Sequence, residues 1–99
     1  MPAARSFHLL DGAKSDLRSA VRWYDERVQG AGDLLVAAID DAIGKVVEAP
    51  LRWPVLEGEY RRHVMKKYPY SIVYRLRADE IFVVAVAHHA RQPDYWRRR

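Results

Sequence analysis

The residues of this chain that are best suited to chemistry are cations, histidines and aromatic side chains, and they fall after residue 60. Cations and histidines contact phosphate groups, while aromatic rings between them stack on bases or on other side chains. The candidates for binding a target or a nucleic acid are Arg61, Arg62, Lys66, Lys67, Arg75, Arg77, His88, His89, Arg91, Tyr95 and Trp96. By contrast, Tyr70 and Tyr74 are expected in the core, and the arginines at 97–99 are expected to form a frayed terminus.

The charge of the chain is divided unevenly between its halves. Residues 1–50 hold six Lys and Arg against eight Asp and Glu, whereas residues 51–99 hold eleven against five. The net charge of +4 thus combines −2 in the first half with +6 in the second. This asymmetry is typical of a basic face that meets nucleic acid or an acidic protein segment, and equally typical of a solvated surface that aids solubility.

The sequence argues against a metal site, a cofactor and a cysteine nucleophile. The chain has no cysteine, and the adjacent His88 and His89 point to opposite faces of an extended segment, so they cannot easily share one ion. The first ten residues lack the apolar run of a secretory signal. The longest apolar stretch, residues 81–87, is much shorter than the ~20 residues of a membrane span. We therefore expect a cytoplasmic protein that uses no cofactor.

Two amphipathic helices are predicted in the first half of the chain. Apolar residues recur at three- and four-residue steps from Ala13 to Val28, and again from about Asp33 to Glu48. Asp11 can accept hydrogen bonds from the free N–H groups at the start of the first helix. Because only a few residues separate the two helices, they are expected to fold back as an antiparallel hairpin.

Strands are predicted on both sides of this hairpin. A short strand is expected within residues 5–10, and three more within 60–68, 70–77 and 81–87, with a loop at 51–59 before them. The last strand is apolar on both faces and is expected at the centre of the sheet. The order β-α-α-β-β-β indicates a single α+β domain over residues 1–99, with a helix hairpin packed on one face of a small, mainly antiparallel sheet and a basic C-terminal tail. Its core is expected to comprise Leu17, Val21, Tyr24, Leu35, Ile39, Ile43, Val46, Ile72, Tyr74, Val84 and Val86.

The order of these elements, together with several local strings, resembles the RelE/ParE superfamily of type II toxin–antitoxin toxins, and most closely its ParE-like branch. The resemblance covers nearly the whole chain and depends on the strings occurring in the right order. They are Ala13-x-x-Asp16-Leu17 with Trp23-Tyr24, Gly32-Asp33-Leu34-Leu35, Pro50-x-Arg52-Trp53-Pro54, Arg61-Arg62, Tyr68-Pro69-Tyr70-x-Ile72-Val73-Tyr74-Arg75, and Val84-Ala85-Val86-Ala87-His88 with Arg91-x-Pro93-x-Tyr95-Trp96.

The resemblance implies a growth-inhibiting bacterial toxin of the cytoplasm that is neutralised by a small antitoxin encoded beside it. The implied partner is therefore a cognate antitoxin, bound in a toxin–antitoxin hetero-oligomer. ParE-like members inhibit DNA gyrase and are not regarded as nucleases. RelE-like members cut mRNA on the ribosome, using basic residues of the sheet and a C-terminal tyrosine or histidine.

The sequence departs from the RelE-like pattern at two positions. Ser71 stands where those nucleases place a catalytic arginine, and His89 stands where they tend to carry another. A hydroxyl cannot replace a fixed positive charge beside a developing phosphorane, and Arg75 shares the face of Ser71 but is displaced along the strand. The favoured interpretation is a non-enzymatic toxin that binds gyrase. The alternatives are a ribosome-dependent endoribonuclease with a modified site of Arg75, His89 and Tyr95, and a decayed toxin that only binds its antitoxin.

Overall fold

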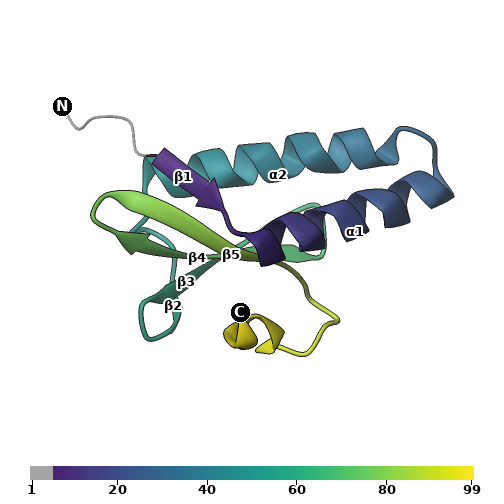
Figure 1. The fold of residues 1–99 in the computed structure, drawn as a ribbon. Helices are drawn as coiled ribbons and strands as arrows, with labels where there is room; N and C mark the ends of the chain where they lie inside the picture. Colours follow the sequence, from purple (N-terminus) through teal and green to yellow (C-terminus); the bar gives the residue numbers. More distant parts are fainter. Residues whose placement is uncertain (1–5) are drawn as a thin grey trace.

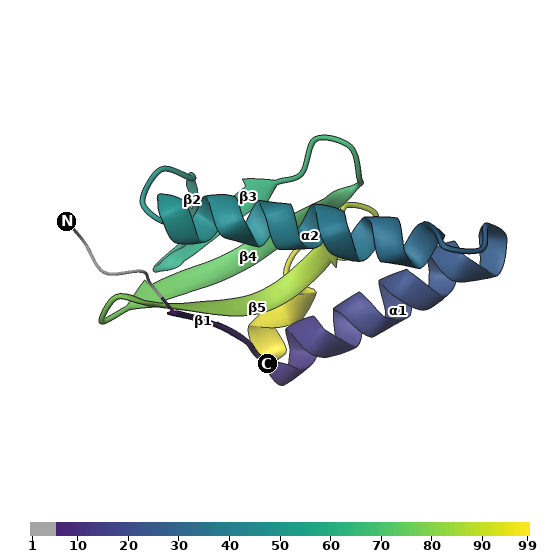
Figure 2. The same cartoon turned by 90° about the horizontal axis from the view of Figure 1, so that it is seen from above.

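The two apolar stripes of the first half form helices α1 (Asp11–Arg27) and α2 (Ala31–Glu48) in the computed structural model, which describes residues 6–99. The turn between them contains Gly30 with a φ of 85°, a left-handed conformation that glycine adopts without strain. The helices therefore run antiparallel side by side, and the tip of the hairpin projects beyond the sheet (Figure 2). Neither helix is long and apolar enough to cross a membrane, and the same holds for every helix within residues 6–99.

The first helix begins earlier than predicted, and the predicted cap is wrong. The capping position belongs to Leu10, and no side chain caps the helix. The reason is that Leu10 connects the first strand directly to the helix: its N–H donates to the carbonyl of Val83 on the sheet, and its own carbonyl accepts from Lys14. Asp11 is then the first helical residue, where its negative charge still faces the positive end of the helix dipole.

A five-stranded mixed sheet lies under the hairpin, which confirms the predicted α+β architecture (Figure 1). The strand order is β1-β5-β4-β3-β2, in which β1 is parallel to β5 and the other pairs are antiparallel. The strands are β1 (Ser6–Leu9), β2 (Val55–Glu57), β3 (Tyr60–Val64), β4 (Tyr70–Arg77) and β5 (Glu80–His88).

Three details of the sheet differ from the sequence prediction. The predicted loop contains β2, whose three residues are all exposed and therefore give no alternating pattern. The third strand ends at Val64 instead of residue 68. The central position belongs to β4, although β5 is indeed buried on both faces. The apolar sequence of β5 thus indicates that both faces of the strand are covered. A strand can be covered on both faces without lying at the centre of the sheet.

The second face of the sheet is covered by the C-terminal segment, which ends in a short 3₁₀ helix, η1 (Tyr95–Arg98) (Figure 1). Trp96 is only 2% exposed and packs with Val73, Val84 and Ala85. The two neighbours Val84 and Ala85 can both face Trp96 because β5 is bulged here: Val73 pairs with Ala85, whereas Tyr74 pairs with Val83.

The main core lies between α2 and the sheet. Of the predicted core residues, those of α2 and the sheet are buried, although Val84 belongs to the cluster under Trp96. Leu17, Val21 and Tyr24 of α1 are only half-buried, because α1 runs along the edge of the sheet while α2 lies over it (Figure 2). The hydroxyl of Tyr74 donates to the carbonyl of Pro50 at 2.6 Å, and burial raises the pKa of Tyr74 to about 12.

The burial of α2 leads to a stability prediction. Replacing Ile39 or Ile43 with alanine is expected to lower the free energy of unfolding by about 2–5 kcal/mol, because each side chain is almost fully buried and would leave a cavity. Leu34→Ala on the same helix is the matched control, since Leu34 is 67% exposed and its loss should cost less than about 0.5 kcal/mol. Urea unfolding measures all three, and equal losses would contradict the packing described here.

Candidate functional site

The predicted basic residues of β3 lie on opposite faces of the sheet, because successive side chains alternate along a strand. Arg61 is half-buried on the helical side and donates to the carbonyls of Trp53 at 2.7 Å and Leu51 at 3.3 Å, so it holds the loop after α2. Arg62 is exposed on the other face. Lys66 and Lys67 are exposed in the turn after β3, beside a groove along α2.

Glu59 holds Arg75 and Arg77 together near the end of β4. The Glu59 carboxylate accepts hydrogen bonds from Arg75 at 3.1 Å and from Arg77 at 2.9 Å, and these bonds lower the pKa of Glu59, with Arg77 as the larger cause. Arg75 lies four residues further along β4 than Ser71, which is about 13 Å at the usual strand rise. The structure therefore does not bring Arg75 to the position of Ser71.

The remaining candidates of the C-terminal part gather around a hollow of about 200 Å³ on the face of the sheet that carries η1. Its lining includes Arg62, His89, Arg91, Tyr95 and the buried Trp96. At its floor the Nε2 atom of His89 lies 2.9 Å from the hydroxyl oxygen of Ser71, which is 2% exposed. Ser71 therefore holds the imidazole of His89 in place.

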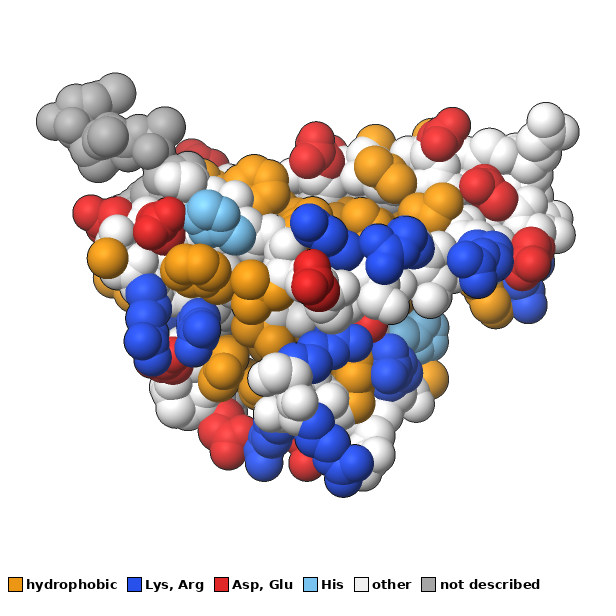
Figure 3. All heavy atoms as spheres, in the orientation of Figure 1, with side chains coloured by type: hydrophobic (Ala, Val, Ile, Leu, Met, Phe, Trp, Pro, Cys, Tyr) orange, Lys and Arg blue, Asp and Glu red, His pale blue; other side chains and the backbone are white. Residues whose placement is uncertain are grey.

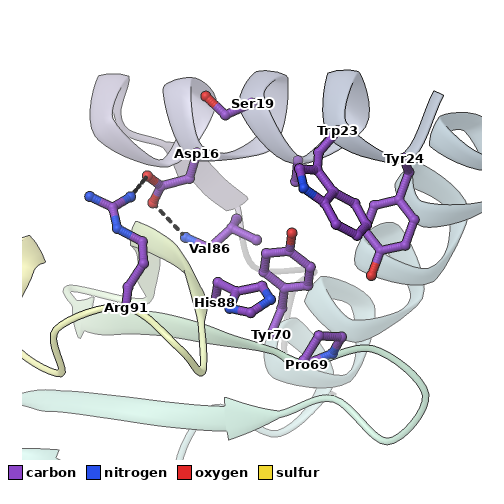
Figure 4. Close-up of a pocket in the computed structure, with 10 residues that line it drawn as sticks. Asp16, Ser19, Trp23, Tyr24, Pro69, Tyr70, Val86, His88 and Arg91 are labelled. Atoms are coloured by element: carbon purple, nitrogen blue, oxygen red, sulfur yellow. Dashed lines mark hydrogen bonds and ion pairs between the residues drawn. The ribbon is translucent and has the colours of Figure 1, made fainter. Parts of the chain in front are cut away.

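The residue that organises this region is Asp16 of α1, which the sequence prediction did not single out as a functional residue. Its carboxylate, only 4% exposed, accepts hydrogen bonds from the Tyr95 hydroxyl at 2.8 Å, from Arg99 at 2.7 and 2.8 Å, and from Arg91 at 3.3 Å. The backbone N–H of Val86 also donates to it, at 3.1 Å (Figure 4).

The position of Asp16 follows from the topology of the sheet. In the described part of the chain, β1 pairs with β5 only as far as Val83, so the rest of this edge of β5 has no neighbouring strand. α1 runs along that edge instead, and its side chains must satisfy the backbone groups there. Asp16 accepts from the N–H of Val86, and Arg99 donates to the carbonyl of Val84 at 3.1 Å.

The expectation of a frayed C-terminus is therefore wrong. Arg99 binds Asp16, and Arg97 forms an ion pair with Glu57 of β2. Gly12 leaves room for the Arg99 side chain beside α1, where an added Cβ atom would require that side chain to shift. The sequence contained one signal of this arrangement: Asp16 is a charged residue on the buried face of α1, between Ala13 and Ala20.

The Asp16 cluster, defined as Asp16, Arg91, Tyr95 and Arg99, keeps the Tyr95 phenol protonated. Burial and the hydrogen bond to Asp16 raise the pKa of Tyr95 well above its ordinary value. The guanidinium groups of Arg91 and Arg99 lie 3.6 and 4.9 Å from the centre of the Tyr95 ring. The cluster therefore acts as a structural connection between α1, β5 and the C-terminus. Within residues 6–99, no three His, Asp or Glu side chains are arranged to hold a metal ion.

The fold just described has a counterpart among solved structures. The chain is similar to a chain of the structure entitled "Chromosomal ParDE TA system from P. aeruginosa", with a TM-score of 0.76 and 16% sequence identity over 86% of this chain and 96% of that one. At this identity the likeness shows the shared fold alone. No curated protein matches the sequence significantly.

The sequence itself identifies the family. Residues 8–93 match the family model described as "ParE toxin of type II toxin-antitoxin system, parDE". The chain therefore belongs to the ParE toxin family, which confirms the resemblance inferred from the sequence strings.

The Asp16 cluster leads to a second stability prediction. Asp16→Ala is expected to lower the free energy of unfolding by about 3–5 kcal/mol, because it leaves the N–H of Val86 and the Arg99 guanidinium without their partner. The exchange of the Val86 amide hydrogen should also become much faster. Asp40→Ala, at an exposed position of α2, is the control and should change stability by less than about 0.5 kcal/mol. Equal stability of both variants, with slow exchange at Val86, would contradict this role.

Proposed function

We propose that this ParE-family toxin inhibits growth by binding DNA gyrase without acting as a nuclease, and that a cognate antitoxin binds and neutralises it. Membership of the ParE family supports the toxin function. The choice of mechanism is supported above all by one observation: the groups that a nuclease would use are engaged in structural contacts or lie apart.

Tyr95 and Arg75 illustrate this observation. A general acid or base needs a pKa near the operating pH, whereas the phenol of Tyr95 has its pKa raised and already donates its proton to Asp16. Arg75 is paired with Glu59 and lies far along β4 from His89. A fixed cation beside the reacting phosphate is therefore not supplied by Arg75.

The exposed charges suit a docking surface for an acidic partner. Arg62 and Arg91 are exposed beside the hollow under η1, and Lys14 and Arg18 are exposed on α1. Figure 3 shows Lys and Arg side chains over α1 and over the C-terminal segment, with an acidic side chain between them. Helical residues of the first half thus join the basic surface that the sequence prediction assigned to the second half. Binding of an acidic protein to such a surface is steered by charge and should slow as salt rises.

The endoribonuclease alternative is favoured by a different observation. His89 and Tyr95 line the same hollow as Arg62 and Arg91, so an imidazole lies close to two cations that could contact phosphate. In this alternative His89 transfers the proton, and Arg62 takes the part that the sequence prediction gave to Arg75.

One pair of assays distinguishes the two mechanisms. Purified toxin is added to a gyrase supercoiling reaction and, in parallel, to programmed ribosomes with labelled mRNA. We expect loss of supercoiling with intact mRNA. Codon-phased cuts with unimpaired supercoiling would favour the nuclease, and silence in both assays would favour a decayed toxin. The antitoxin is tested separately, by co-expression of the neighbouring small open reading frame, which should co-purify and restore growth.

Single substitutions sharpen this test. In a docking surface, Arg62→Ala and His89→Ala should each weaken inhibition by a modest factor. The reason is that many contacts contribute to the binding energy, although a few residues dominate it. In a nuclease, His89→Ala should lower cleavage by roughly 10²–10⁴-fold while ribosome binding persists. Arg77→Ala is the matched control, since Arg77 is a cation of the same sheet that pairs with Glu59 away from the hollow. A loss as large in Arg77→Ala as in Arg62→Ala would contradict the position of the docking surface.

A further inference from the structure

A second pocket, of about 330 Å³, opens on the helical side of β5, where α1 passes the edge of the sheet. Its walls are mainly aromatic and come from two distant parts of the sequence, Trp23 and Tyr24 of α1 and Pro69, Tyr70 and His88 of the sheet (Figure 4). Its volume is at the lower end of the range for ligand pockets, about 300–1,000 Å³. The space therefore suits one bulky side chain or a small aromatic molecule.

The charged groups of this pocket leave donors free, but hardly any acceptors. The Asp16 carboxylate at its end already accepts from Tyr95, Arg99, Arg91 and the N–H of Val86, so little acceptor capacity is left there. The side chain of Arg91 is 51% exposed and gives one N–H group to Asp16, which leaves other donors of its guanidinium free.

The tyrosine at the floor of the pocket is the clearest unused donor. Tyr70 is 6% exposed, and its hydroxyl has no hydrogen-bond partner among the described residues. Figure 4 shows that hydroxyl pointing toward α1, between Asp16 and Trp23. Burial raises the pKa of Tyr70, so the hydroxyl keeps its proton at neutral pH. The Tyr70 hydroxyl is not among the fully buried side-chain atoms that lack a partner, so it opens to the pocket, where an acceptor of an occupant could receive its hydrogen bond.

Two further donors face the same space. The N–H of Ala90 donates to Nδ1 of His88 at 3.0 Å, so the neutral ring carries its proton on Nε2 and can donate there. The indole N–H of Trp23 has no acceptor within residues 6–99, and the Trp23 side chain is about half exposed. Aromatic walls with surplus donors are complementary to an aromatic ring that carries an acceptor group.

We propose that this pocket binds an aromatic side chain with an adjoining carboxylate, presented by an acidic segment of a partner protein. The ring would lie among Trp23, Tyr24 and Tyr70, and the carboxylate would accept from the Tyr70 hydroxyl and Arg91. Charge-assisted hydrogen bonds of this kind are about twice as strong as neutral ones. The assignment does not depend on gyrase being the target, because it concerns a site that none of the mechanisms above uses.

A nucleotide, which also joins a ring to an anion, fits the pocket less well. Bases are recognised by hydrogen bonds to edges that present donors as well as acceptors. Asp16 is the one carboxylate in the lining and is occupied, so the donors of a base would have only hydroxyl oxygens such as that of Ser19 to bind. A protein segment is therefore the occupant that the donors favour.

The test uses two small probes that differ only in the proposed acceptor, N-acetyl-phenylalanine and N-acetyl-phenylalaninamide. Each is titrated into the full chain while the amide and indole N–H resonances are followed by NMR. We expect N-acetyl-phenylalanine to shift the Trp23 indole resonance with a Kd on the order of 1 mM. The amide probe should bind about tenfold more weakly, because it lacks the charge. Equal affinities, or no shift at Trp23 with about 10 mM of either probe, would overturn the proposal.

Variants locate the contacts. Tyr70→Phe keeps the ring and should weaken the carboxylate probe about three- to tenfold and the amide probe by less, because an amide oxygen accepts a weaker hydrogen bond than a carboxylate. Trp23→Ala, at a half-exposed position that folding should tolerate, should weaken both probes strongly. Phe7→Ala removes an aromatic side chain of similar exposure on β1, outside the pocket, and should change neither affinity. Full probe binding by Trp23→Ala would contradict the assigned site.

A third titration distinguishes the nucleotide. Adenosine monophosphate should shift the Trp23 resonance less than N-acetyl-phenylalanine does at the same concentration, and a larger shift would favour a nucleic acid as the occupant. All of these measurements are independent of the supercoiling assay, so a toxin that fails to inhibit gyrase can still bind the probes.

Discussion

The open edge of β5 is the constraint on which the rest of this structure depends. β1 pairs with the first part of β5, and the chain then continues into α1. From Val84 onward, the backbone groups on this edge of β5 therefore need partners that no strand within residues 6–99 provides. The Asp16 carboxylate and the Arg99 guanidinium provide them, and each is in turn stabilised by the other. A buried carboxylate would be costly alone, but here it is surrounded by donors. The ion pair between Asp16 and Arg99 thus connects α1, the sheet and the C-terminus.

This arrangement also distinguishes the polar side chains that are held in intramolecular ion pairs and hydrogen bonds from those that are open to a partner. Tyr95 and Arg99 are fixed by Asp16, and Arg75 and Arg77 by Glu59. The cations left for a partner are exposed ones such as Arg62, which are better suited to recognition than to the fixed geometry of catalysis.

The parts of the fold that depend on local pattern could be predicted from the sequence, whereas those that depend on distant contacts could not. The helices and the buried residues of α2 follow from periodicity, and the strand β4 from its alternation. The strand β2 was missed because all its residues are exposed. The residue types of the candidate site were predictable, but their partners were not, since Asp16 and Arg99 are 83 positions apart and no local pattern relates them.

Arg91 connects the two cavities that flank the Asp16 cluster, because it lines both the hollow under η1 and the pocket beside α1. Its bond to Asp16 is the longest in the cluster, at 3.3 Å, and its side chain is half exposed. A carboxylate bound in the pocket could accept from the free N–H groups of Arg91, and Asp16 would keep Arg99, Tyr95 and the N–H of Val86 even if Arg91 moved. Because Arg91 and His88 both line the hollow and the pocket, an occupant that moves either side chain would also change the other cavity.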